Sequence, residues 1–241
     1  MRDDTLPTED RSSLPLATSA TILHFPTRIT PRPITLEPAS GDAVAALLAA
    51  VIAAQDHRIA NHRPTLLASV GAVAGFAAQQ SLLLDGGHRW LQPNRAKHLD
   101  RLLLSADPTH ASLWRGLQQT ATGLGVKHLP NPGKLLEATL RCVGTNQFGV
   151  IILPLNYRLV EQPQTTLLRV WAQTRNHFDR RDEKPAAWPS LAFSACTRRI
   201  VMDQRQVPPH VAVRIIMQSA LAMALIEPKL IPGAALKPDA L

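Results

Sequence analysis

The stretch PTLLASVGAVAGFAAQQSLLL, residues 64–84, decides the fold. From Leu66 to Leu84 it contains no charged residue, and small residues recur about one helical turn apart at Gly71, Ala74, Gly75 and Ala78. Small side chains let the backbone of another helix approach closely. We therefore predict that this stretch is a central helix enclosed by neighbouring helices.

The same stretch has nearly the length of a membrane-spanning helix. Its serines, glutamines, alanines and glycines keep its mean hydropathy below that of a span rich in Leu, Ile and Phe. We expect a buried helix of a soluble protein and no membrane span. Acidic residues at the N-terminus, with no apolar run after them, argue against a secretion signal, so we expect a cytoplasmic location.

The composition favours a single helical domain. The chain has 241 residues, 45% of them hydrophobic and only 4% aromatic, so Leu, Ala, Val and Ile must fill the core. Residues 1–40 are rich in Pro, Ser and Thr without apolar periodicity, which predicts an irregular, extended or disordered arm. We expect a mainly α, compact multi-helix domain over residues 41–228 and a flexible tail over residues 229–241.

Apolar periodicity and capping residues predict the other elements of the domain. Further helices are expected near residues 42–60, 99–104, 107–123, 131–143, 165–178, 185–198 and 208–227. Ser40 or Asp42, Asp107 and Asn131 are the expected N-caps. Two apolar runs around Asp85-Gly86-Gly87 predict a small β-hairpin near residues 81–92. Residues 148–154 read as a short strand or an extended crossing.

The order of several short motifs resembles a family of proteins, found mainly in alphaproteobacteria, to which no function is assigned. The motifs are GAVAGFAAQ (71–79), DG (85–86), SLWRGL (112–117), FGV (148–150), AAWPSL (186–191) and RIIMQSALAMALIEP (214–228). The resemblance covers about residues 42–228 and implies a compact helical domain with a small β element. It implies no catalytic residue. The chain departs from the family after the expected hairpin turn, where HRWLQPN (88–94) replaces an aromatic residue and a Gly-Asp pair.

No linear motif for catalysis, metal binding or a cofactor is present. The chain lacks GxSxG, HExxH, GxGxxG and P-loop patterns, and its histidines and carboxylates are dispersed. Cys142 and Cys196 are far apart and belong to no CxxC or Cys/His cluster, which is typical of buried structural thiols. We therefore assign no catalytic residue, no metal ligand and no cofactor, and whether the protein is an enzyme stays open.

Four polar residues in apolar surroundings are the candidates for a ligand pocket between helices: Arg158, Gln79, Gln80 and Gln218. A buried Arg or Gln needs hydrogen-bond partners, and carbonyls at helix ends commonly supply them. The alternative is that Arg158 holds an anion or a carbonyl group in a pocket with the glutamines. Trp114, Trp171 and Trp188 lie in helical segments and read as core anchors.

Three functions remain open from the sequence. The first is a non-catalytic binding or accessory protein that acts through an interhelical pocket or a protein–protein surface, with a protein partner or a second copy. The second is an enzyme whose residues converge only in space. The third is nucleic-acid binding, suggested by a net charge of +8. Because the basic residues are scattered without interleaved aromatics, we disfavour this third function.

Overall fold

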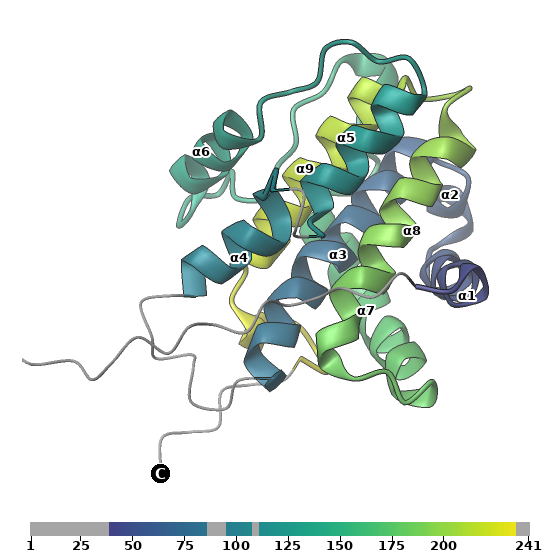
Figure 1. The fold of residues 1–241 in the computed structure, drawn as a ribbon, viewed down its shortest axis with the longest axis vertical. Helices are drawn as coiled ribbons and strands as arrows, with labels where there is room; N and C mark the ends of the chain where they lie inside the picture. The colour runs from purple at the N-terminus through teal and green to yellow at the C-terminus, as the bar shows by residue number, and fades with distance from the viewer. Residues whose placement is uncertain (1–38, 86–94, 108–110, 235–241) are drawn as a thin grey trace, which may run out of the picture. The chain divides into compact units, whose positions relative to one another are not determined.

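The fold is mainly α-helical, as predicted (Figure 1). The computed structural model describes residues 39–85, 95–107 and 111–234, and these residues form no strand. The α-helices of this part of the chain are α1 (Gly41–Ala53), α2 (His57–Ala60), α3 (Arg63–Asp85), α4 (Arg95–Leu104), α5 (Leu113–Gly123), α6 (Pro132–Cys142), α7 (Pro163–Arg180), α8 (Trp188–Asp203) and α9 (Pro209–Ala224). Short 3-10 helices are η2 (Leu155–Tyr157), η3 (Pro185–Ala187) and η4 (Pro228–Leu230).

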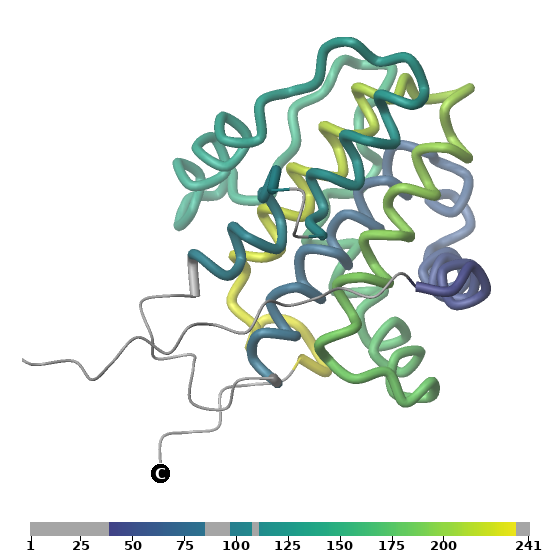
Figure 2. The backbone as a smooth tube through the Cα atoms, viewed as in Figure 1, coloured from purple at the N-terminus to yellow at the C-terminus, as the bar shows by residue number. Residues whose placement is uncertain are grey.

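The central helix is α3, which packs against α9, α8, α7, α4 and α1. Figures 1 and 2 show it running between α8 and α9, with α1 and α6 on opposite sides of it. By length and composition alone, Arg63–Leu84 could cross a membrane, and within the described chain it is the one helix that could. However, 94% of the most apolar 18-residue stretch of this helix is buried inside the fold, as expected for a core helix.

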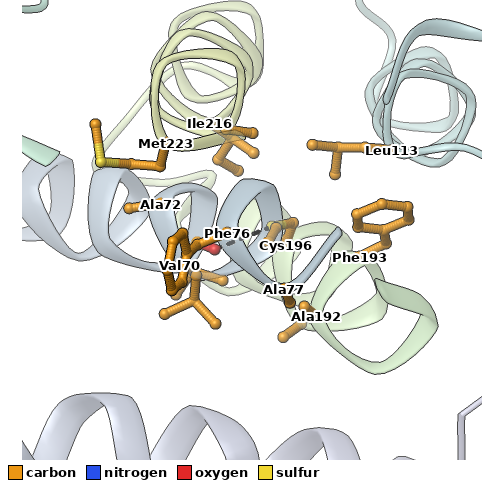
Figure 3. Packing of buried hydrophobic residues seen from close by; sticks show 14 of the residues in the cluster. Val70, Ala72, Phe76, Ala77, Leu113, Ala192, Phe193, Cys196, Ile216 and Met223 are labelled. Atoms are coloured by element: carbon orange, nitrogen blue, oxygen red, sulfur yellow. Dashed lines mark hydrogen bonds between the residues drawn. The ribbon is translucent and has the colours of Figure 1, made fainter. Parts of the chain in front are cut away.

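Two glycines allow α3 and α9 to touch backbone to backbone. A Cβ atom built on Gly75 would lie 1.9 Å from the Ala220 carbonyl oxygen, and one built on Gly71 would lie 2.6 Å from that of Ile216. Figure 3 shows the large side chains beside this contact, including Phe76 of α3 and Ile216 of α9. Only glycine fits at both positions, so the small residues within 64–84 form the surface on which α9 packs.

The helix starts follow the predicted capping chemistry with one exception. The Ser40 side chain accepts from the Ala43 N–H, and the Asn131 side chain accepts from the Lys134 N–H, both at 3.2 Å. The expected cap at Asp107 is wrong, because α5 begins at Leu113 and Ser112 accepts from the Arg115 N–H. The sequence pattern could not distinguish two capping residues only five positions apart.

The predicted β-hairpin near residues 81–92 is wrong where the structure describes it. Residues 81–85 form the last turn of α3, since Leu82 and Leu83 continue its apolar pattern without a breaking residue. Residues 86–92 lie outside the described part of the chain, as does the predicted arm up to residue 38. Of the predicted tail over residues 229–241, Ile231 is buried in the core, and residues 235–241 are not among those described.

An aromatic cluster closes one side of the core, and it confirms the predicted anchoring role of two tryptophans. Trp171 of α7 meets Phe76 of α3 edge to face with ring centroids 4.6 Å apart. Trp188 stacks on Phe178 at 4.9 Å, and its indole N–H donates to the Glu183 carbonyl. Trp114 is also buried. These rings join α3, α7 and α8 into one core.

Candidate functional site

Gln79, the first of the four polar candidates, caps a helix. It is fully buried in α3, and its amide nitrogen donates to the carbonyls of Ala224 at 2.9 Å and Ile226 at 2.7 Å. Both carbonyls lie at the C-terminal end of α9, where backbone acceptors have no partner within the helix. The Gln79 side chain therefore joins α3 to the end of α9, and this capping role explains why a glutamine is buried there.

Replacing Gln79 with Met is expected to lower the free energy of unfolding by about 2 kcal/mol. The substitution keeps the length of the side chain but leaves two buried carbonyls without their donor. Urea unfolding followed by circular dichroism measures the change. Gln218→Met is the matched control, because Gln218 is only half-buried in α9 and its Oε1 accepts no hydrogen bond from the described residues. Equal losses in both variants would contradict the capping role.

The other three candidates differ in burial. Gln80 is fully buried in α3, whereas Gln218 is half-buried in α9. Arg158 follows η2 and is exposed, and its guanidinium pairs with no carboxylate among the described residues. The four side chains therefore differ in exposure, and Arg158 lies on the surface while Gln79 and Gln80 lie in the interior.

A shallow groove of about 350 Å³ does lie between α5 and α8. Hydroxyl and amide side chains dominate its lining, which comprises Ala111, Ser112, Gly116, Gln119, Thr120, Ser190, Phe193, Ser194 and Thr197. Thr120 and Thr197 donate their hydroxyl protons to backbone carbonyls at 2.8 and 2.9 Å. Because no lining residue is titratable, the groove itself supplies no general acid, general base or charged anchor.

The thiol of Cys196 is poorly placed for chemistry. Cys196 is fully buried, and burial raises the pKa of its thiol, so the thiolate does not form near neutral pH. Its sulfur lies 3.6 Å from the Val70 carbonyl, the contact drawn in Figure 3. Among the described residues, no three His, Cys, Asp or Glu side chains gather closely enough to hold a metal ion.

A buried ion pair at the end of α8 is the polar feature that the sequence analysis missed. Arg199 and Asp203 are 2% and 3% exposed, and the guanidinium donates to both carboxylate oxygens at 2.6 and 2.7 Å. Arg63, at the start of α3, lies 3.7 Å from the same carboxylate and donates to Gln206 at 3.0 Å. Burial raises the pKa of Asp203, whereas Arg199 and Arg63 oppose this change.

This pair left a signal in the sequence. Arg199 follows Ala192 and Cys196 at spacings of seven and three residues, which places it on the apolar face of α8, and Asp203 lies one turn further on. Two opposite charges at this spacing on an apolar face indicate a buried pair. Arg199 holds both carboxylate oxygens and Arg63 lies beside one of them, so the pair helps to join α8 to the start of α3.

A second polar network ties the start of α3 to the segment after η2. His62 Nδ1 lies 2.8 Å from the Thr65 hydroxyl and 3.4 Å from the Thr65 N–H, and that hydroxyl accepts from the Val160 N–H at 3.0 Å. An N–H can only donate, so His62 Nδ1 must be the acceptor and unprotonated. Burial lowers the pKa of His62, in agreement with this geometry.

We expect stability to fall as the pH drops below the ordinary histidine pKa of 6.5. The folded-state pKa of His62 is lowered, so the unfolded chain takes up the proton first and is favoured in acid. Burial, together with the charge of Arg181, lowers the pKa of His177 in the same direction. Urea midpoints at about pH 7.5 and about pH 5.5 measure the loss.

His62→Asn should reduce this loss, because asparagine accepts the Thr65 N–H without titrating. The control is His210→Gln, since His210 is exposed on α9 and has no hydrogen bond among the described residues. If His62→Asn shows the same loss between the two pH values as the wild type, then His62 does not cause it.

The most unusual surface of the described chain is a run of exposed aliphatic side chains. Of its eleven exposed large hydrophobic side chains, six lie between residues 140 and 160: Leu140, Val143, Val150, Ile152, Leu155 and Val160. We call residues 140–160 the aliphatic segment. Ile152 is 77% exposed and Leu155 is 84% exposed, on the two sides of Pro154. Exposed apolar side chains that lie together on a surface are typical of interaction sites, and these six lie within 21 residues of the sequence.

The aliphatic segment is held firmly at its base. Ile151 and Leu159 are buried in the core, and the Ile151 N–H donates to Gln162 Oε1 at 3.1 Å. The strand expected as one alternative over residues 148–154 is not formed, since residues 148–149 belong to a turn and residues 150–154 have no regular secondary structure. Buried and exposed positions alternate from Gly149 to Ile152. On a solvated surface the outward positions would be polar, yet here they are Val150 and Ile152.

Comparisons with protein-family models, curated proteins and solved structures find no match to this chain. The resemblance to the alphaproteobacterial family therefore stays a prediction. No activity, ligand or partner comes to this chain from a relative, and the function must be argued from its own surface and interior.

Proposed function

We propose that this chain is a non-catalytic binding or accessory protein that acts through the aliphatic segment. The observation that carries the proposal is the cluster of six exposed aliphatic side chains within 21 residues, anchored by a buried base. Isolated exposed hydrophobic residues are common on proteins, but clustered ones lose contact with water when a partner covers them. The proposal takes up the surface alternative that the sequence left open.

The enzymatic alternative has less support. The groove between α5 and α8 has no titratable lining residue, and the buried carboxylate of Asp203 is neutralised by Arg199 inside the fold. Histidines with a lowered pKa, His62 and His177, lie outside this groove. A general base must reach its substrate, and neither histidine lines a described cavity with a nucleophile beside it.

Nucleic-acid binding also has less support. Part of the basic charge is matched by carboxylates, since ion pairs with Asp or Glu engage Arg63, Arg141, Arg169, Arg175, Arg181, Arg199 and Lys229. Phosphate contacts require basic side chains that are free to replace counterions. The pairing reduces the number available on the described surface.

Site-specific photo-crosslinking in the cells that produce the protein tests the proposal. A photoreactive side chain at position 152 should form adducts, because a partner covers this position. The same side chain at position 118, which is exposed on α5 outside the aliphatic segment, should form none. The captured molecule must then bind the purified wild type and not the variant Ile152→Asn/Leu155→Asn. Equal adduct yields at positions 152 and 118 would refute the proposed function.

A further inference from the structure

We infer that the partner of the aliphatic segment is the surface of an anionic lipid membrane, to which the protein binds peripherally. This inference rests on the proposed function and names the partner of the same surface. The aliphatic side chains around Pro154 would enter the boundary between lipid head groups and acyl chains, and basic side chains would meet the acidic head groups.

The shape of the segment suits a bilayer. Ile152 and Leu155 are the two most exposed large hydrophobic side chains of the described chain, so they project outward and do not line a groove. Buried Ile151 and Leu159, together with the hydrogen bond from the Val160 N–H to Thr65, hold the backbone below them. A projecting apolar tip on a fixed base can enter a fluid hydrocarbon layer without a complementary pocket.

The side-chain types also favour lipid over protein. The exposed hydrophobic side chains of the segment are all Leu, Ile or Val, with no exposed Trp, Phe, Tyr or Met among them. Protein hot spots are enriched in Trp, Tyr and Arg, whereas Leu and Val are under-represented there. Aliphatic groups need only an apolar medium, which the acyl chains provide without directional contacts.

The charges within and just before the segment in the sequence favour an anionic surface. Between residues 127 and 161 the two carboxylates are each paired, Glu137 with Arg141 and Glu161 with Arg169. Exposed Lys127, Lys134 and Arg158 have no carboxylate partner among the described residues. A second copy would bring the same cations together, and the chain as a whole carries +8. Acidic lipids complement this charge, whereas another copy repels it.

Vesicle sedimentation with the purified full-length protein tests the inference. We expect the wild type to bind vesicles of phosphatidylcholine mixed with phosphatidylglycerol, to bind phosphatidylcholine alone more weakly, and to lose affinity in high salt. Ile152→Asn/Leu155→Asn should reduce binding to the mixed vesicles by about tenfold or more. Arg158→Gln should reduce binding to the mixed vesicles severalfold and leave binding to phosphatidylcholine unchanged.

The control variant is Leu168→Asn/Leu230→Asn, which removes two exposed aliphatic side chains outside the segment. It should bind like the wild type, and circular dichroism checks that each variant is folded. Absence of wild-type binding, or equal loss in the control, overturns the membrane inference. If vesicles are not bound but position 152 captures a protein, the proposed function stands without the membrane. If position 152 captures nothing, both fail.

Discussion

Replacing Gly75 with Ala is expected to lower the free energy of unfolding by more than about 3 kcal/mol, because Gly75 has the tightest surroundings of the described glycines. The added Cβ would lie 1.9 Å from the Ala220 carbonyl oxygen and 2.6 Å from its carbon. Both atoms are backbone atoms of α9, so no side-chain rotation relieves the clash. The two central helices would have to separate, and the core contacts around them would be lost.

Gly123→Ala is the matched control for this prediction. Gly123 also lies in a helix, α5, but a Cβ atom added to it would meet no atom within 4 Å. Alanine is the better helix former by about 1 kcal/mol, so this variant should be unchanged or slightly more stable. Urea unfolding measures both. If Gly75→Ala is as stable as Gly123→Ala, then α3 and α9 do not pack as closely as described.

Asp203→Asn is expected to cost about 3–5 kcal/mol of stability, because it leaves the buried Arg199 guanidinium without its charge partner. The carboxylate is 3% exposed and accepts two hydrogen bonds from Arg199, so water cannot replace it. Urea unfolding at neutral pH measures the loss. The neighbouring Arg63 lies 3.7 Å from the carboxylate and loses part of its interaction as well.

Two further variants distinguish the cost of one unpaired buried charge from the contribution of the ion pair to stability. Arg199→Met/Asp203→Leu should be more stable than Asp203→Asn, because it removes both charges from the interior and leaves apolar groups there. Glu137→Gln should leave stability almost unchanged, since Glu137 and Arg141 form the same four-residue spacing on the exposed surface of α6. A small effect of Asp203→Asn, equal to that of Glu137→Gln, would contradict the buried pair.

The proposed binding surface is supported by the same buried contacts at the start of α3. The hydrogen bond from the Val160 N–H to Thr65 ends in the turn that starts α3, next to Arg63 and its contact with Asp203. The base of the aliphatic segment is therefore joined to the central helix. Variants at Ile152 and Leu155 touch the exposed tip alone, which is why they can test binding without testing folding.

Capping residues and apolar periodicity were sufficient to predict much of the fold. Proline and a capping side chain start α6 at Asn131-Pro132, and the apolar period marks α3, α7 and α9 from neighbouring residues alone. The hairpin was mispredicted because Asp85-Gly86-Gly87 resembles a turn, while the burial of Leu83 is a property of the assembled fold. The residues of the turn alone do not reveal that Leu83 is buried.

The candidate site was harder to predict, because burial and partners are properties of the assembled fold. Arg158, which the sequence singled out, is exposed, whereas Arg199, whose place on the apolar face of α8 was overlooked, is 2% exposed beside Asp203. Likewise Gln79 and Gln218 are both glutamines in apolar helices, and only Gln79 meets the end of α9. Sequence spacing suggests a face of a helix, but not what lies opposite to it.

The sequence by itself determined that residues 64–84 form a charge-free helix with small residues one turn apart, because helix formation and close packing depend on local side-chain size. Tertiary structure alone decided that Gly75 meets Ala220, that Asp203 is enclosed by arginines, and that Ile152 and Leu155 stay outside the core. Apolar side chains look alike in a sequence, and only the packing of distant helices determines which of them remain exposed.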